Sequence, residues 1–170
     1  MAYLKILYIG GVKSGKSRLA EQRALVLATP MPPVYLATTN PQDQSMADRI
    51  AQHRQQRGDR FLTIEEPWDL VSAVAALPEG RVVLVDCLTL WLSNMLLDDR
   101  PESDLYDTID RLLALPHTLI FVINDVGSGI HAPTALGRRF TDLSGLVAQR
   151  VAAGCQEVYH CIAGIDQRIR

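Results

Sequence analysis

The sequence has few cysteines and no long apolar run, so it lacks the features of disulfide-rich and membrane-spanning proteins. Its 170 residues include only three cysteines, Cys87, Cys155 and Cys161, and no C-x-x-C pair. This pattern gives no sign of a disulfide framework or a thiolate metal site, and it predicts reduced thiols in the cytoplasm. No segment approaches the ~20 consecutive apolar residues of a membrane-spanning helix.

The sequence also lacks an excess of charge of either sign. The formal net charge is −2, and charged residues make up 21% of the chain. This balance gives no electrostatic reason to expect nucleic acid as the main partner. The length and a hydrophobic content of 48% predict one domain over residues 1–170 with a substantial core. The motif that begins at residue 10 starts too early for a cleaved signal peptide to precede it, so we expect a cytoplasmic protein.

The most informative segment that is present is residues 10–17. They read GGVKSGKS and fit the phosphate-loop pattern G-x-x-x-x-G-K-[ST]. Glycines let the backbone turn tightly and direct its N–H groups at phosphate oxygens. Lys16 supplies a positive charge for the β- and γ-phosphates, and the Ser17 hydroxyl can ligate Mg²⁺. We therefore expect a nucleoside triphosphate and Mg²⁺ to bind at Gly10, Gly11, Val12, Lys13, Ser14, Gly15, Lys16 and Ser17.

The segments around this motif support that interpretation. The apolar run Tyr3–Ile9 predicts a buried strand before it, and Arg18–Leu27 predicts a helix after it. Strand-like runs and helical patterns then alternate, which is typical of an α/β fold with a mostly parallel central sheet and helices on both faces. The predicted strands are 34–37, 82–86, 118–124 and 157–163, with a weaker edge strand in 164–170, and the predicted helices are 45–57, 67–77, 88–97, 105–113 and 134–153.

Several polar residues follow predicted strands and are therefore candidates for the same sheet edge. Asp86 ends the run Val82–Asp86, and an acid there lies beside the phosphate site in an open α/β sheet. It can hold Mg²⁺ with Ser17, directly or through water, although capping the next helix is an alternative role. Thr38, Thr39 and Asn40 follow another strand and can contact the nucleotide, or simply form a turn.

The predicted helix over 45–57 carries the remaining candidate. His53 and Arg57 are four residues apart and therefore lie one turn apart on the same face. A neutral imidazole can attack phosphorus, and a guanidinium beside it can neutralise phosphate charge. A solvated histidine among surface arginines is the other interpretation. Spacing alone favours it, because a lone histidine on a helix seldom does chemistry.

Taken together, these segments resemble the bifunctional adenosylcobinamide kinase/adenosylcobinamide-phosphate guanylyltransferase family of cobalamin biosynthesis. The resemblance covers essentially the whole chain. It is carried by the phosphate loop followed by H-x-x-x-R at 53–57 and D-C-L-T-x-W-x-S-N at 86–94. Further matching segments are YLATT at 35–39, NDVGSGI at 124–130 and RRFTDLSG at 138–145.

The resemblance implies more than the residues alone. The family has a RecA-like phosphate-loop (P-loop NTPase) fold, usually as a homotrimer. It phosphorylates the adenosylcobinamide hydroxyl and then transfers GMP from GTP to that phosphate, with GTP and ATP as substrates and a corrinoid as acceptor. By position, His53 matches the histidine that carries GMP in the family, so the resemblance favours His53 as a nucleophile. The other positions that match the family's nucleotide site are Gly10–Ser17, Thr38–Asn40, Arg54–Arg57, Glu65 and Asp86.

Two other functions are compatible with the same motifs. The chain can be a phosphate-loop kinase of a different small metabolite, in which His53 has only a structural role. It can also be a nucleotide-dependent switch without a small-molecule acceptor. A covalent GMP adduct distinguishes the family reaction from the first, and turnover of cobinamide distinguishes it from the second.

Overall fold

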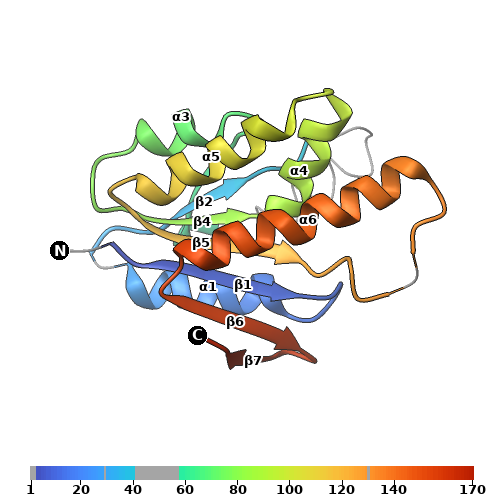
Figure 1. The fold of residues 1–170 in the computed structure, drawn as a ribbon. Helices are drawn as coiled ribbons and strands as arrows, with labels where there is room; N and C mark the ends of the chain where they lie inside the picture. The colour runs from blue at the N-terminus through green and yellow to red at the C-terminus, as the bar shows by residue number, and fades with distance from the viewer. Residues whose placement is uncertain (1–2, 29, 41–57, 130) are drawn as a thin grey trace.

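The computed structural model describes residues 3–28, 30–40, 58–129 and 131–170. These residues form one seven-stranded sheet with the strand order β3-β2-β4-β5-β1-β6-β7 (Figure 1). Neighbouring strands are parallel throughout, except that β7 runs antiparallel to β6. The strands are β1 (Lys5–Gly10), β2 (Val34–Ala37), β3 (Leu62–Glu65), β4 (Val82–Asp86), β5 (Thr118–Asn124), β6 (Glu157–Ile162) and β7 (Ile165–Arg168).

Described helices cover both faces of this sheet, as the sequence predicts. In Figure 1, α1 lies below the sheet, and α3, α4, α5 and α6 lie above it. Two separate apolar clusters fill the two interfaces, and the one on the α1 side contains Ala20 and Ala24. The helices are α1 (Lys16–Leu27), α3 (Leu70–Ala75), α4 (Leu88–Leu97), α5 (Glu102–Ala114) and α6 (Ala135–Gly154), with a short 3-10 helix, η1, at Gly58–Arg60.

The two ends of the sheet have different roles because its strands are parallel. The carboxyl ends of six strands meet at one edge, where open α/β sheets bind their ligands. Only β7 reverses direction, through a tight turn at Ala163 and Gly164, both of which have positive φ, 52° and 81°. The edge strand expected in 164–170 is therefore confirmed as β7.

One predicted helix needs correction, and one strand was not predicted. The helix predicted over 67–77 is shorter, because α3 begins only after Asp69, whose carboxylate caps it by accepting a hydrogen bond from the Ser72 amide at 3.0 Å. The Glu66 carboxylate accepts hydrogen bonds from the amides of Trp68 and Asp69, so this segment is a turn. Strand β3 was not predicted, since LTIE is short and none of its residues is buried.

Helix α4 is as buried as its composition predicts. Leu88, Trp91 and Leu92 have no exposed surface, and they pack in the cluster between the sheet and the upper helices. Among the described residues, no helix is both long and apolar enough to cross a membrane. The helix predicted over 45–57 lies outside the described residues.

Candidate nucleotide site at the carboxyl edge of the sheet

The predicted phosphate loop joins the carboxyl end of β1 to the amino end of α1, as its motif requires. Gly15, directly before the helix, has a φ of 92°, a conformation that L side chains rarely adopt. A Cβ atom on Gly10 would lie only 2.4 Å from the Cys161 carbonyl oxygen of the neighbouring strand β6. The glycines at these positions are therefore demanded by local geometry as well as by the motif.

Two polar side chains of the loop, Ser14 and Lys16, are buried but have few partners among the described residues. The Lys16 ammonium donates a hydrogen bond to the Gly11 carbonyl at 3.2 Å, although only 7% of the residue is exposed. The buried hydroxyl of Ser14 has no hydrogen-bond partner among the described residues. The first turn of α1 carries no acidic side chain, so its N-terminal dipole is left to attract an anion. This combination is what a phosphate site needs.

Asp86 lies on the same side of the sheet as α1. It pairs in register with Ala37 of β2 and Val122 of β5, both of which belong to the apolar cluster that includes α1. The Tyr35 hydroxyl donates a hydrogen bond of 2.7 Å to its Oδ2 atom and so fixes the carboxylate. The Asp86 carboxylate is therefore held by a side chain of the neighbouring strand β2, while its backbone belongs to β4.

The oxygen atoms of Ser17 and Asp86 fit Mg²⁺ chemically. Magnesium prefers a few hard oxygen ligands and completes its shell with water and substrate phosphates. Among the described residues there is no cluster of three or more histidine, cysteine, aspartate or glutamate side chains. That donor set suits a cation brought in with a nucleotide better than one held by a cage of protein ligands.

Thr38 connects the ends of two strands. It is fully buried, and its hydroxyl donates to the Cys87 carbonyl at 2.7 Å and accepts from the Cys87 amide at 2.9 Å. Its own carbonyl accepts a hydrogen bond of 2.9 Å from the Asn94 side chain of α4. The two hydroxyl bonds join the end of β2 to the segment after β4, and the carbonyl bond joins it to α4. Thr39 and Asn40, which follow, are half-buried.

Of the predicted site residues that the structure describes, Glu65 lies on the strand farthest from the phosphate loop. It ends β3 and pairs in register with Ala37, which in turn pairs with Asp86, so the three form a row across the sheet. Four strand spacings separate β3 from β1. At about 4.8 Å each, they place Glu65 about 19 Å from the loop. At that distance Glu65 is far from the phosphates of a nucleotide bound in the loop.

The segment after β5 lies at the same edge and borders a hollow. The Asn124 amide donates a hydrogen bond of 2.7 Å to the Thr89 hydroxyl of α4, which fixes the end of the strand. Beyond it, the side chains of Asp125 and Ser128 are joined at 2.6 Å. A cavity of about 450 Å³ lies between this segment and α6, with Gly127 and Gly129 in its lining.

Three predicted site residues, His53, Arg54 and Arg57, lie outside the described residues. Strand β2 ends at Ala37, and the described residues stop at Asn40 and resume at Gly58.

Sequence reasoning missed three residues that organise this edge: Tyr35, Thr89 and Asn94. Asn94 donates to the carbonyls of Thr38 and Pro67 at 2.9 and 3.0 Å, and it is only 8% exposed. A detectable signal existed for two of them, because Thr89 and Asn94 are polar residues in a mostly apolar helix. Such residues need buried partners. No local signal links Tyr35 to Asp86, since that contact depends on which strands are neighbours.

The strand order and the loop define the class of protein: a domain with the RecA-like phosphate-loop NTPase fold. A solved ATPase from the type III secretion system of pathogenic bacteria shares this fold with a TM-score of 0.53, at 12% sequence identity over 92% of this chain and 50% of that chain. At this low identity the likeness concerns the fold alone.

Sequence comparison narrows the class to a family. The model for cobinamide kinase / cobinamide phosphate guanyltransferase matches residues 6–169, and the chain belongs to this family of transferases. The bifunctional adenosylcobalamin biosynthesis protein CobP of Pseudomonas aeruginosa is 37% identical, over 98% of both chains. The bifunctional adenosylcobalamin biosynthesis proteins CobU of Escherichia coli and Salmonella typhimurium are each 33% identical, over 98% of this chain and the whole of theirs.

Proposed function

We propose that this protein phosphorylates the side-chain hydroxyl of adenosylcobinamide and then transfers GMP from GTP to the resulting phosphate, which gives adenosylcobinamide-GDP. The observation that carries the proposal is an intact phosphate loop between β1 and α1 in a chain that matches the family almost from end to end. Both reactions are displacements at phosphorus. One triphosphate site can therefore serve both.

In the proposed kinase step, the corrinoid hydroxyl oxygen attacks the γ-phosphorus of ATP or GTP. The bond between that phosphorus and the bridging oxygen breaks, the nucleoside diphosphate leaves, and the hydroxyl proton passes to solvent. Lys16 and the loop amides neutralise the phosphate charge, and positioning supplies most of the rate. Ser17 and Asp86, directly or through water, would hold Mg²⁺, which neutralises developing charge in such reactions.

In the proposed guanylyl step, the neutral imidazole of His53 attacks the α-phosphorus of GTP. A phosphorus–nitrogen bond forms and pyrophosphate leaves. A phosphate oxygen of the phosphorylated corrinoid then attacks the same phosphorus, and the imidazole is released. Arg54 and Arg57 would balance the charge on the transferred phosphate. These roles rest on the match to the family.

The strand order supports different roles for the loop and for Glu65 in this proposal. The loop after β1 would hold the phosphates, whereas Glu65 lies about 19 Å away along the sheet, by four strand spacings. We therefore propose that Glu65 serves the sugar or base end of the nucleotide. Thr39 and Asn40 lie after β2, between these two positions in the strand order.

Three further properties belong to the proposal. The enzyme would act as a homotrimer, which analytical ultracentrifugation measures directly. It would act in the cytoplasm, in keeping with three buried free cysteines, Cys87, Cys155 and Cys161. Its partners would be a nucleotide and a corrinoid, with no nucleic acid.

One incubation tests the function. The wild-type protein is mixed with GTP, Mg²⁺ and adenosylcobinamide, and both protein and product are analysed by mass spectrometry. We expect adenosylcobinamide-GDP and a protein fraction heavier by one GMP. Phosphorylation of another metabolite without an adduct would indicate a different kinase. GTP hydrolysis with unchanged cobinamide would indicate a switch.

The nucleophile is tested with GTP labelled at the α-phosphorus. His53→Ala should take up no acid-labile, base-stable label, whereas the wild type should take up label. His160→Gln, which changes a half-buried histidine on β6, is the matched control and should be labelled like the wild type. Undiminished labelling of His53→Ala would reject His53 as the nucleophile.

A further inference from the structure

The turn between β6 and β7 lies directly against the phosphate loop. The Gly164 amide donates a hydrogen bond of 2.8 Å to the Ser14 carbonyl. The Gly164 carbonyl accepts one of 3.0 Å from the Arg18 guanidinium in the first turn of α1. A Cβ atom on Gly15 would lie 2.9 Å from the Gly164 Cα atom. Both polar groups of Gly164 are therefore bonded to the loop or to the helix behind it.

The bond to the Ser14 carbonyl has a geometric consequence for the loop. In a planar trans peptide, the C=O and N–H groups point in opposite directions. The Ser14 carbonyl points outward to the hairpin, so the Gly15 N–H of the same peptide points the other way, away from the hairpin. Gly15 is left-handed, with φ of 92°, and its own carbonyl accepts from the Leu19 amide at 3.0 Å. The orientation of this N–H is thus fixed from both sides.

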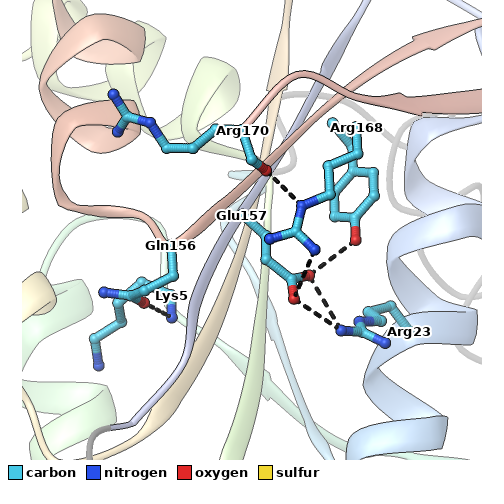
Figure 2. A network of polar contacts seen from close by, with 7 residues as sticks. Lys5, Arg23, Gln156, Glu157, Arg168 and Arg170 are labelled. Carbon is cyan, nitrogen blue, oxygen red and sulfur yellow. Dashed lines mark hydrogen bonds and ion pairs between the residues drawn. The ribbon is translucent and has the colours of Figure 1, made fainter.

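A second set of contacts ties the hairpin to the body of α1. Figure 2 shows the Glu157 carboxylate of β6 between Arg23 of α1 and Arg168 of β7. Arg23 donates to its two oxygens at 3.2 and 3.1 Å, and Arg168 lies 3.7 Å away. The Tyr159 hydroxyl donates to the same carboxylate at 2.9 Å. Since only 9% of Glu157 is exposed, this is a partly buried ionic network that holds α1, β6 and β7 together.

We propose that the β6–β7 hairpin positions the phosphate loop: the Gly164 amide, through the Ser14 carbonyl, holds the Gly15 N–H in the direction of the bound phosphates. Gly164 is then a positioning residue, because it acts on the nucleotide through Ser14 and Gly15 and does not touch it. The inference rests on the proposed nucleotide site. The precision of the nucleotide site then depends on a hairpin that is about 150 residues away in sequence, because the loop and the hairpin are adjacent only in the folded sheet.

The chain supplies a matched pair of glycines for the test. Gly164 has φ of 81° and donates its amide to a carbonyl of another segment. Gly80 has φ of 83° and donates its amide to the Pro116 carbonyl at 2.9 Å, at the opposite edge of the sheet. An added Cβ would meet its nearest atom at 3.6 Å at Gly164 and at 3.8 Å at Gly80, both ordinary contacts. An alanine substitution therefore introduces the same backbone strain at both sites.

GTP binding is measured by calorimetry, and the melting temperature is measured with and without GTP. Gly164→Ala and Gly80→Ala should lower the melting temperature without GTP by similar amounts. Only Gly164→Ala should weaken GTP binding, by about three- to tenfold, and reduce the stabilisation that GTP confers. Gly164→Asn should restore binding, because asparagine tolerates a left-handed backbone. Equal GTP affinity in the two alanine variants would overturn the proposal.

A measurement on the unmodified protein covers the case in which Gly164→Ala fails to fold. Saturating GTP should slow hydrogen exchange in the peptide that contains Gly164, because a loop held by phosphate holds the Ser14 carbonyl in turn. Unchanged exchange there would overturn the positioning role while leaving the nucleotide site intact. Failure of the wild type to bind GTP would instead overturn the proposed function and this inference together.

Discussion

Two buried lysines, one at each edge of the sheet, differ in how the protein treats their charge. Lys5 begins β1 and is 4% exposed, and its ammonium donates to the carbonyls of Leu115 and His117 at 2.8 and 2.5 Å. Lys16 lies past the carboxyl end of the same strand and is 7% exposed. Within the described residues its ammonium makes a longer bond, 3.2 Å, to the Gly11 carbonyl.

The difference supports a division of the sheet between stability at its amino edge and the proposed nucleotide binding at its carboxyl edge. At the amino edge the protein itself solvates the buried charge with short bonds to carbonyl oxygens. At the carboxyl edge the charge, the buried Ser14 hydroxyl and the N-terminus of α1 are left with few protein partners. An unpaired buried polar group costs free energy unless a ligand satisfies it. The carboxyl edge is therefore the edge that a phosphate group would complete.

The strongest test of this comparison is Lys16→Ala. We expect GTP turnover in both proposed steps to fall by about 100-fold or more, because a preorganised charge on the phosphates is lost. The free energy of unfolding without nucleotide should change little, since this ammonium has one long bond within the described protein. Steady-state kinetics and denaturant titration measure the two quantities. Unaltered GTP affinity would contradict the assignment of the loop.

Lys5→Met should give the reverse pattern. Methionine keeps an apolar stem but removes the donor to two carbonyls, one of them fully buried. We expect a loss of about 1–3 kcal/mol in the free energy of unfolding. The Michaelis constant for GTP should stay at the wild-type value. A variant that binds GTP poorly while keeping its stability would break the separation between the two edges.

The pH dependence of that loss sharpens the comparison. Burial lowers the pKa of Lys5 to about 8 from 10.5, so the unfolded chain holds this proton more tightly than the folded one. Its contribution to the free energy of unfolding is therefore constant below about pH 8 and rises with pH up to about 10.5. The stability gap between wild type and Lys5→Met should widen by about 2 kcal/mol between pH 7.5 and 10. Urea titrations of both proteins across this range measure it, and a constant gap would contradict the lowered pKa.

The sequence predicts the fold well where local patterns suffice. The strands Val34–Ala37, Val82–Asp86 and Thr118–Asn124 have the predicted bounds, because each is a continuous apolar run between polar or turn-forming segments. Helix α4 at Leu88–Leu97 does too. Strand β3 could not be predicted in this way, since its residues alternate weakly and pair only with β2 at the edge of the sheet.

The site was predictable only in part, for a related reason. The phosphate loop is contiguous, so its residues and their roles follow from one motif. The bonds that fix the rest of this edge join strands that are far apart in sequence, as between Thr38 and Cys87 or between Gly164 and Ser14. Those contacts depend on the strand order, which no local pattern encodes. The resemblance to a family supplied site residues such as Glu65 but none of these bonds.

Tyr35→Phe is the mildest change we consider and probes the carboxyl edge alone. It removes the hydroxyl that donates to the Asp86 carboxylate at 2.7 Å and leaves the ring, which packs edge-on against Phe61 at 5.8 Å. We expect a loss of about 1 kcal/mol in the free energy of unfolding. If Asp86 serves Mg²⁺, the less constrained carboxylate should also raise the Mg²⁺ concentration for half-maximal GTP binding by about three- to tenfold.

Calorimetric titration of GTP at several Mg²⁺ concentrations separates this effect from a general loss of structure. Lys5→Met is the matched control, because it destabilises the protein by a similar or larger amount from the opposite edge. Its Mg²⁺ dependence should equal that of the wild type. If GTP binding depends on Mg²⁺ in the same way in Tyr35→Phe and Lys5→Met, Tyr35 has only a packing role. The Tyr35 hydroxyl is then not required for Asp86 to serve the nucleotide.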